Sequence, residues 1–183
     1  MRVITGKARG LQLKAPRGLD TRPTLDQVKE GMFSAVQFEI EGRRVLDLFA
    51  GSGQLGIEAL SRGADSCVFV DAGREPCRII RENLMRAKLL ENARVVQADY
   101  LVFLKSCRER FDLILLDPPY AEDFLENALK TISEIDILTN GGIILCERPV
   151  EKAFFDRFPG LIHHRDYRYG RAAVTLFRKA DLA

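Results

Sequence analysis

The tetrapeptide Asp117-Pro118-Pro119-Tyr120 holds the side chains of this sequence that are best placed to do chemistry. It follows the apolar run 113–116, which has the pattern of a buried parallel strand. Two consecutive prolines cannot continue a central strand, because they have no N–H for the ladder and a fixed φ. We therefore expect a stiff loop at a strand's carboxyl end, presenting a carboxylate, a free proline carbonyl and an aromatic ring. These groups suit a planar amino group such as the exocyclic NH2 of a nucleobase; a rigid turn with a capping aspartate is the structural alternative.

A glycine-rich turn lies upstream, where the strand-like run 44–49 meets the start of a helix. Gly51, Gly53 and Gly56 have the spacing G-x-G-x-x-G, which permits close backbone approach to a ligand. The same spacing occurs in dinucleotide-binding proteins, so a dinucleotide is one possible ligand. Two features oppose a nicotinamide cofactor: Asp47 lies within the strand end, and the chain lacks a second half for the nicotinamide. An acid at this position better suits a cationic amino acid moiety, such as the methionyl end of S-adenosylmethionine.

Two more acids follow predicted strands. Asp71 ends the run 67–71, where a carboxylate can accept hydrogen bonds from both hydroxyls of a ribose. Asp99 and Tyr100 follow the run 94–97; Asp99 could accept from an adenine amino group while the Tyr100 N–H faces adenine N1. Both aspartates could instead cap the helices that follow them. Together with Asp47 and the glycines, they line successive strand ends, as an adenosine-containing ligand would require.

The strand-like runs 44–49, 67–71, 94–97, 112–116 and 142–147 alternate with helix-like stretches, which predicts an α/β fold with a doubly wound, mostly parallel sheet. Residues 2–15 read as a short basic hairpin, and Thr24 begins a helix with capping-box spacing to Gln27. Residues 161–168 and 172–178 form a second hairpin pattern. We expect an extension over residues 1–41 and the main domain over residues 42–183.

The bulk composition supports one domain, since 183 residues at 46% hydrophobic content suffice for a buried core. A net charge of only +2 conceals basic ends around an acidic centre, a pattern that fits a polyanion as well as ordinary solvated charge. Four scattered cysteines, of which Cys67 and Cys146 lie in apolar runs, favour a reducing cytoplasm over disulfides or zinc. We find no signal peptide and no apolar run of membrane length.

Taken in order, these motifs resemble those of Rossmann-like methyltransferases that act on exocyclic amino groups. Nearly the whole chain resembles the RsmD family, bacterial enzymes that methylate one guanine N2 in 16S ribosomal RNA. The stretches that narrow the match are Arg2-Val3-Ile4-Thr5-Gly6-Lys7-Ala8-Arg9-Gly10, Arg22-Pro23-Thr24 and Leu48-Phe49-Ala50-Gly51-Ser52-Gly53. The resemblance implies a seven-stranded sheet whose last strand is antiparallel, S-adenosylmethionine as cofactor, and ribosomal RNA, free or within a small subunit, as partner.

The resemblance also assigns roles to individual residues. The segment Arg22-Pro23-Thr24 would close over the methionyl end, whereas Gln27 and Lys29 stand where the family often has arginines, so no binding role is carried over to them. The expected catalytic residues are Asp117, Pro118 and Tyr120; the expected RNA contacts are Lys7, Arg9, Pro119, Arg168 and Arg171. The expected cofactor contacts are Arg22, Thr24, Asp47, Phe49, Gly51, Gly53, Asp71, Asp99 and Tyr100.

The expected reaction is direct, metal-free transfer of a methyl group to guanine N2. The amino group would donate hydrogen bonds to Asp117 and to the Pro118 carbonyl, which would expose the lone pair of its nitrogen. Tyr120 would stack on a base flipped out of the RNA. Two alternatives stay open at this point. One is an amino-adenine methyltransferase of DNA or RNA, and the other is a non-catalytic module that only binds an adenosine ligand.

Overall fold

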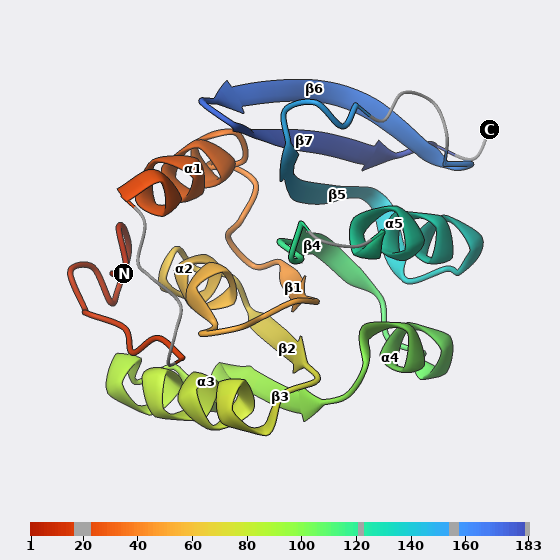
Figure 1. Cartoon of the computed structure of the whole chain (residues 1–183). Helices are drawn as coiled ribbons and strands as arrows, with labels where there is room; N and C mark the ends of the chain where they lie inside the picture. Colours follow the sequence, from red (N-terminus) through yellow and green to blue (C-terminus); the bar gives the residue numbers. More distant parts are fainter. Residues whose placement is uncertain (17–22, 121–122, 154–157, 182–183) are drawn as a thin grey trace.

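A seven-stranded sheet crosses the centre of the computed structural model, which describes residues 1–16, 23–120, 123–153 and 158–181 (Figure 1). The strand order is β3-β2-β1-β4-β5-β7-β6, and β7 is antiparallel to both of its neighbours. The expected mostly parallel sheet with an antiparallel last strand is therefore confirmed. The strands are β1 (Arg44–Asp47), β2 (Ser66–Asp71), β3 (Ala93–Gln97), β4 (Phe111–Leu116), β5 (Leu138–Pro149), β6 (Leu161–Tyr169) and β7 (Ala172–Lys179).

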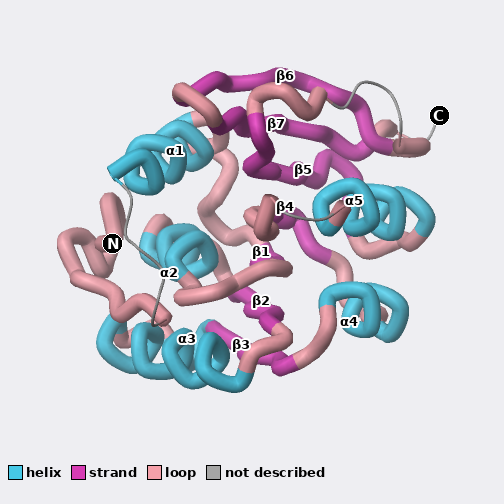
Figure 2. The backbone as a smooth tube through the Cα atoms, viewed as in Figure 1, coloured by secondary structure: helices cyan, strands magenta, loops and turns pink. Residues whose placement is uncertain are grey.

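Helices cover both faces of this sheet, with α1, α2 and α3 on one side and α4 and α5 on the other (Figures 1 and 2). The central strands are apolar throughout because alternate side chains enter different layers. Val45 packs in the layer under α1 to α3, and Leu46 packs in the layer under α4 and α5. The helices are α1 (Pro23–Ser34), α2 (Gln54–Ser61), α3 (Arg74–Ala87), α4 (Tyr100–Ser106) and α5 (Phe124–Glu134), with a 3-10 turn η1 (Leu90–Asn92).

The predicted bounds of the first four strands agree with the structure to within about one residue at most ends, but the predicted start of β5 is too late. The segment 139–142 has turn composition, yet β5 already begins at Leu138, which pairs with Phe111. A register shift separates that pair from the next one, Leu113 with Ile143, so extra residues of β5 bulge out between them. Beyond the bulge the pairing is regular up to Cys146.

The N-terminal hairpin is held by few of its own bonds and lies along α2. Arg2 and Gln12 form a single antiparallel bridge, and the Val3 N–H donates to the Leu11 carbonyl at 3.0 Å. At the hairpin's tip the Lys7 N–H donates to the Ser61 carbonyl at 2.8 Å. Gly6 has a φ of +88°, and a Cβ there would lie 1.8 Å from the Ser61 oxygen, so this close approach requires glycine.

A buried ion pair fastens the hairpin to α1 and α2. The Lys29 side chain is 1% exposed; its Nζ lies 3.8 Å from Glu58 Oε2 and donates to the Arg2 carbonyl at 2.5 Å. The Glu58 carboxylate also accepts from two backbone N–H groups of the hairpin and from Arg62 Nε at 2.9 Å. Lys29, whose role the sequence left open, thus has structural partners, whereas Gln27 is exposed.

The expected division at residues 41 and 42 stays a prediction. Val3 and Leu13 of the hairpin and Val28 of α1 belong to the same apolar cluster as Val45 of β1. All four cysteines are free, and Cys67 and Cys146 are buried in the core as expected. Within the described residues, no helix combines the length and apolar character needed to cross a membrane.

Candidate active site

Four acidic side chains follow or end neighbouring strands at the carboxyl edge of the sheet. Asp47 ends β1, Asp71 ends β2, Asp117 follows β4 and Glu147 lies near the end of β5. Leu116 is in register with Cys146, so Asp117 and Glu147 are the next residues along two adjacent strands. In open α/β sheets this is the edge at which ligands bind.

The glycine loop between β1 and α2 is built as its spacing predicts. Gly51 and Gly53 have φ values of +57° and +80°, which favour glycine. A Cβ on Gly56 would lie 2.3 Å from the Phe69 ring, so this glycine lets α2 pack directly on β2. Asp71 fixes the loop from the neighbouring strand, because its Oδ2 accepts from the Gly51 N–H at 2.9 Å.

Asp47 is a fully buried carboxyl group, and one of its two oxygens has no hydrogen-bond partner among the described residues. Its Oδ2 accepts from the Gly56 N–H at 3.0 Å, whereas its Oδ1 has no hydrogen-bond partner among the described residues. Burial raises the pKa of Asp47 from 3.8 to about 7, against the lowering effect of the Gly56 bond, and the charge of Asp71 raises it further. Such a group favours a cationic ligand, because a nearby positive charge would relieve the cost of ionisation.

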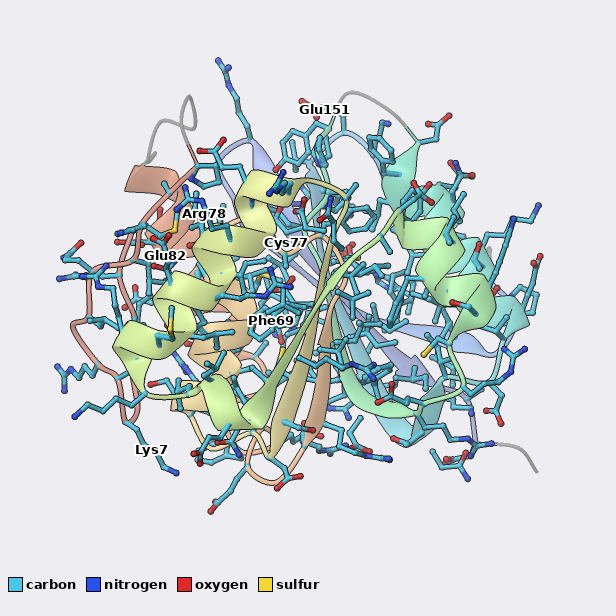
Figure 3. All side chains as sticks on the ribbon, turned by 90° about the horizontal axis from the view of Figure 1, so that it is seen from below. Lys7, Phe69, Cys77, Arg78, Glu82 and Glu151 are labelled. Carbon is cyan, nitrogen blue, oxygen red and sulfur yellow. The ribbon has the colours of Figure 1, made fainter. Side chains whose placement is uncertain are left out.

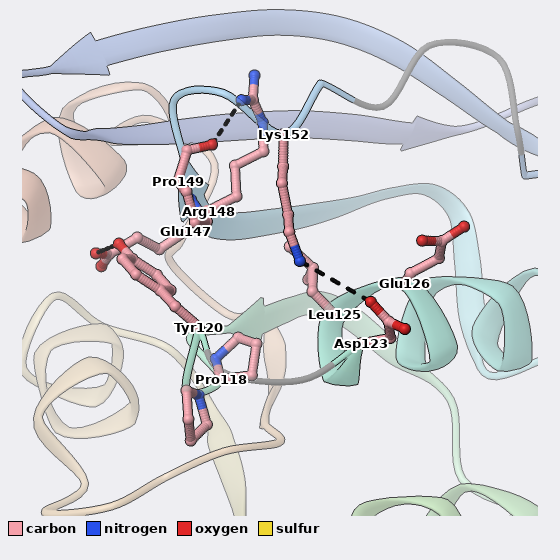
Figure 4. A pocket seen from close by; sticks show the side chains of 10 residues that line it. Pro118, Tyr120, Asp123, Leu125, Glu126, Glu147, Arg148, Pro149 and Lys152 are labelled. Carbon is pink, nitrogen blue, oxygen red and sulfur yellow. Dashed lines mark hydrogen bonds and ion pairs between the residues drawn. The ribbon is translucent and has the colours of Figure 1, made fainter.

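Asp117 and Glu147 form a second acidic group with Tyr120. Burial, the charges of Glu147 and Asp47, and a hydrogen bond between the Asp117 and Glu147 side chains hold the pKa of Asp117 well above its usual range. The Tyr120 hydroxyl donates to Glu147 Oε1 at 2.6 Å (Figure 4). Sequence reasoning missed Glu147, although an acid directly after the apolar run 143–146 repeats the pattern of Asp71 and Asp117.

The two prolines form one wall of a small pocket between the loop after β4 and the end of β5 (Figure 4). Pro118 is buried and Pro119 is exposed, while Tyr120 remains 45% exposed. Glu147 and Lys152 line the opposite side, and Lys152 Nζ lies 3.9 Å from Asp123. The strand therefore ends before the two prolines, as expected, and the stiffness of the loop stays a prediction.

An aromatic cluster follows the first, third and fourth strands. The Phe49 ring lies 5.0 Å from Tyr100 and 6.2 Å from Phe124, centroid to centroid. Asp99 caps α4, since its Oδ1 accepts from the Leu101 N–H at 2.9 Å and from a second N–H in the same turn. The capping alternative for Asp99 thus describes its observed contacts, and its contact with an adenine amino group stays a prediction.

The residues expected to touch RNA lie at two separate places. Arg168 and Arg171 flank the turn from β6 to β7 beside the end of β5, where the Val150 N–H donates to the Arg171 carbonyl at 3.0 Å. Lys7 and Arg9 lie at the far end of α2, and Figure 3 shows Lys7 and Glu151 at opposite ends of the molecule. Eight helical residues separate the glycine loop from the Lys7 contact, a rise of about 12 Å.

These four basic residues share a further property. All are exposed, and within the described part of the chain none of them has a recorded ion pair. Other basic residues at the two chain ends are used internally, in the pairs Arg2–Asp26, Lys14–Glu82, Arg178–Glu39 and Lys179–Asp136. Arg22 lies outside the described residues, as does the side chain of Thr24, so their expected cofactor contacts stay predictions.

The sheet order, the glycine loop and the acids at the strand ends place this chain in the class of Rossmann-like methyltransferases. Within the described residues, no three or more histidine, cysteine or acidic side chains are grouped so that they could hold a metal ion.

The chain belongs to the family described as "Conserved hypothetical protein 95", whose model matches residues 1–178. It is 31% identical over 179 residues to "Ribosomal RNA small subunit methyltransferase D" of Escherichia coli, covering 98% of this chain and 90% of that protein. It is 40% identical over 182 residues to "Putative rRNA methyltransferase YlbH" of Bacillus subtilis, covering 98% and 99%. The resemblance to the RsmD family is thereby confirmed.

The fold agrees with solved structures over its full length. A structure titled "Putative methyltransferase yhhF from Escherichia coli" superposes with a TM-score of 0.87 at 32% identity, covering 100% of this chain and 99% of that one. A Haemophilus influenzae structure titled as a methylase superposes with a TM-score of 0.83 at 30% identity, covering 98% of both chains.

Proposed function

We propose that this protein transfers a methyl group from S-adenosylmethionine to the exocyclic N2 of a guanine in small-subunit ribosomal RNA. The observation that carries the proposal is the position of Asp117 and Pro118 at the end of β4, beside the partly exposed ring of Tyr120 and next to β1, which leads into the glycine loop. The names of the relatives from E. coli and B. subtilis support rRNA as the substrate and methyl transfer as the reaction.

The strand ends fit the proposed cofactor. S-adenosylmethionine carries positive charge on its sulfonium and its ammonium group, and when bound it supplies an electrophilic methyl group. The unpartnered Asp47 Oδ1 is a buried negative oxygen of the kind that such a ligand would stabilise. In the proposal Gly51 and Gly53 let the backbone approach the ligand, Asp71 contacts the ribose, and Phe49, Asp99 and Tyr100 surround the adenine.

The residues of the tetrapeptide act on the base. The Asp117 carboxyl and the Pro118 carbonyl accept the two N2 hydrogens and draw the nitrogen toward a pyramidal form with an exposed lone pair. Because the loop is rigid before the base arrives, these acceptors stabilise developing charge with little reorganisation. Tyr120 stacks on the base and Pro119 borders it, which holds the nitrogen near attack distance.

The RNA in this proposal reaches the acidic edge from the side of Arg168 and Arg171. Phosphate contacts from these arginines would position the strand while the target base leaves its stack. Lys7 and Arg9, at the far end of α2, would contact a more distant part of a folded RNA. Two basic sites separated in this way suit a structured RNA better than a short single strand.

The test is to identify the methylated nucleoside directly. Ribosomal RNA, both naked and within small subunits, is prepared from a bacterium whose corresponding gene is deleted and is incubated with the protein and labelled S-adenosylmethionine. We expect N2-methylguanosine at one position, by nucleoside mass spectrometry and mapping. RNA from the undeleted strain, which already carries the methyl group, is the matched control and should accept little label. Methyladenosine as the product, or no transfer to either form of the RNA, would refute the proposal.

A further inference from the structure

Glu147 is an acid beside the reacting site that the reaction described above does not use. We propose that Glu147 accepts a hydrogen bond from the N1–H of the target base, and that this contact selects guanine over adenine. The inference rests on the proposed function, because it concerns the base held by Asp117 and Pro118.

The strand register places Glu147 beside Asp117. Asp117 and Glu147 directly follow the paired residues Leu116 and Cys146 on adjacent strands, and their side chains are hydrogen-bonded to each other. Guanine N1 and N2 are likewise neighbouring positions on one edge of the base. A base whose N2 lies at Asp117 therefore has its N1 within reach of the next carboxylate.

The contacts of Glu147 orient it toward the pocket. Glu147 lines the pocket beside Pro118 and Tyr120, and the Tyr120 hydroxyl fixes its Oε1 at 2.6 Å. Arg148, the next residue of β5, also lines this pocket, but its guanidinium is engaged by other groups. It binds Thr175 and Asp166, at 2.7 and 3.1 Å.

Glu147 is also a nearly buried carboxylate without a cation. It is 7% exposed, and within the described residues no ion pair is recorded for it or for Asp117. Its hydrogen-bond partners are the Tyr120 hydroxyl and the Asp117 side chain. A side chain of this kind, buried and without a cation, gains from a further donor, and guanine offers an N–H at the required position.

The two purines differ at the atom that would face Glu147. Guanine carries a hydrogen on N1 and donates, whereas adenine N1 has a lone pair and accepts. With adenine in the site, the Glu147 carboxylate would face the lone pair of adenine N1. The two acceptors would repel each other, and neither would gain a hydrogen bond. Asp117 and Pro118 would accept either amino group, so the discrimination falls to Glu147.

The experiment compares two target bases in one synthetic RNA, with guanine or 2-aminopurine at the mapped position. 2-Aminopurine keeps the reacting amino group but has an acceptor at N1. We expect the protein to prefer guanine by at least tenfold in kcat/KM, and Glu147→Gln to reduce this preference severalfold, because an amide can donate to N1. Glu151→Gln, an exposed change of the same charge, should leave the preference unaltered.

Three results would overturn the inference. The unaltered protein could methylate both RNAs at similar rates, or Glu147→Gln could slow both equally and leave the preference intact. If Glu147→Gln transfers no methyl group, the equilibrium affinities for the two RNAs are compared instead, and an unchanged affinity ratio refutes the role. Failure of the proposed function is distinct, because the unaltered protein would then methylate neither RNA.

Discussion

Two acidic sites near the glycine loop are built in different ways. Glu58, in the middle of α2, has its carboxylate surrounded by Lys29, Arg62 and two backbone N–H groups. At the sheet edge, Asp47 and Glu147 are buried and Asp117 is half-buried, and no ion pair is recorded for any of the three within the described residues. The charge of the first site is therefore satisfied by cations of the protein, whereas the charge of the second is not.

The difference separates structural burial from functional burial. A buried carboxylate whose charge and hydrogen bonds are satisfied by the protein lowers the stability of the fold little and can hold segments together, as Glu58 holds the hairpin. Carboxyl groups buried without cations reduce stability, as the raised pKa values of Asp47 and Asp117 indicate, and a fold retains such groups where a ligand or reaction uses them. We therefore assign Lys29 and Glu58 to architecture and propose that the edge acids serve binding and catalysis.

A large loss of stability is expected at the satisfied site. Lys29→Met removes a buried cation and leaves Arg62 as the remaining cation beside Glu58, which should lower the free energy of unfolding by about 3 kcal/mol. Methyl transfer per folded molecule should stay within twofold, because Lys29 is not part of the edge. Urea unfolding and a rate assay under folding conditions measure the two quantities.

Lys14→Met is the matched control for this change, since Lys14 pairs with Glu82 at the surface and should matter far less to stability. A Lys29→Met protein of normal stability that had lost methyl transfer would contradict the assignment, because Lys29 would then belong to the reacting site.

The opposite result is expected at the unsatisfied site. The folded pKa of Asp47, about 7, lies above its ordinary value of 3.8, so ionisation favours the unfolded chain as the pH rises between these values. At about pH 8 the charged form costs up to about 4 kcal/mol, from a shift of about three pKa units. Asp47→Asn should therefore unfold at higher urea than the unaltered protein at this pH, and its advantage should vanish below about pH 4.

The same substitution should weaken binding of S-adenosylmethionine, since the buried negative charge is lost. Calorimetric titration measures that affinity. Equal stability of the two proteins at every pH would show that Asp47 is not a strained buried acid.

Much of this contrast was visible in the sequence, and two parts were not. The apolar runs identified the strands, and acids directly after them identified Asp71 and Asp117, because parallel strands end at a common edge. Glu147 was missed because its importance depends on the pairing of β4 with β5, which no local pattern reveals. The role of Lys29 was left open, although it lies one turn from Met32 on the apolar face of α1, where a lysine requires a buried partner.

The smallest expected effect is on the salt dependence of RNA binding, and it distinguishes the two basic sites. Removing Arg168 and Arg171 together by alanine substitution should reduce the salt dependence of RNA binding by about one unit of slope for each phosphate that the protein no longer neutralises. Removing Lys7 and Arg9 should give a smaller change, because their site lies away from the reacting edge. Affinities measured over a series of salt concentrations decide this, and two unchanged slopes would exclude both sites from the RNA interface.

The most direct test of the central claim is Asp117→Asn, studied by single-turnover methyl transfer alongside titration of the cofactor. If Asp117 is the acceptor for the reacting amino group, the rate should fall by about 10²- to 10³-fold while the affinity for S-adenosylmethionine changes little. A rate near that of the unaltered protein, or parallel loss of transfer and cofactor binding, would contradict the claim and make Asp117 a structural residue.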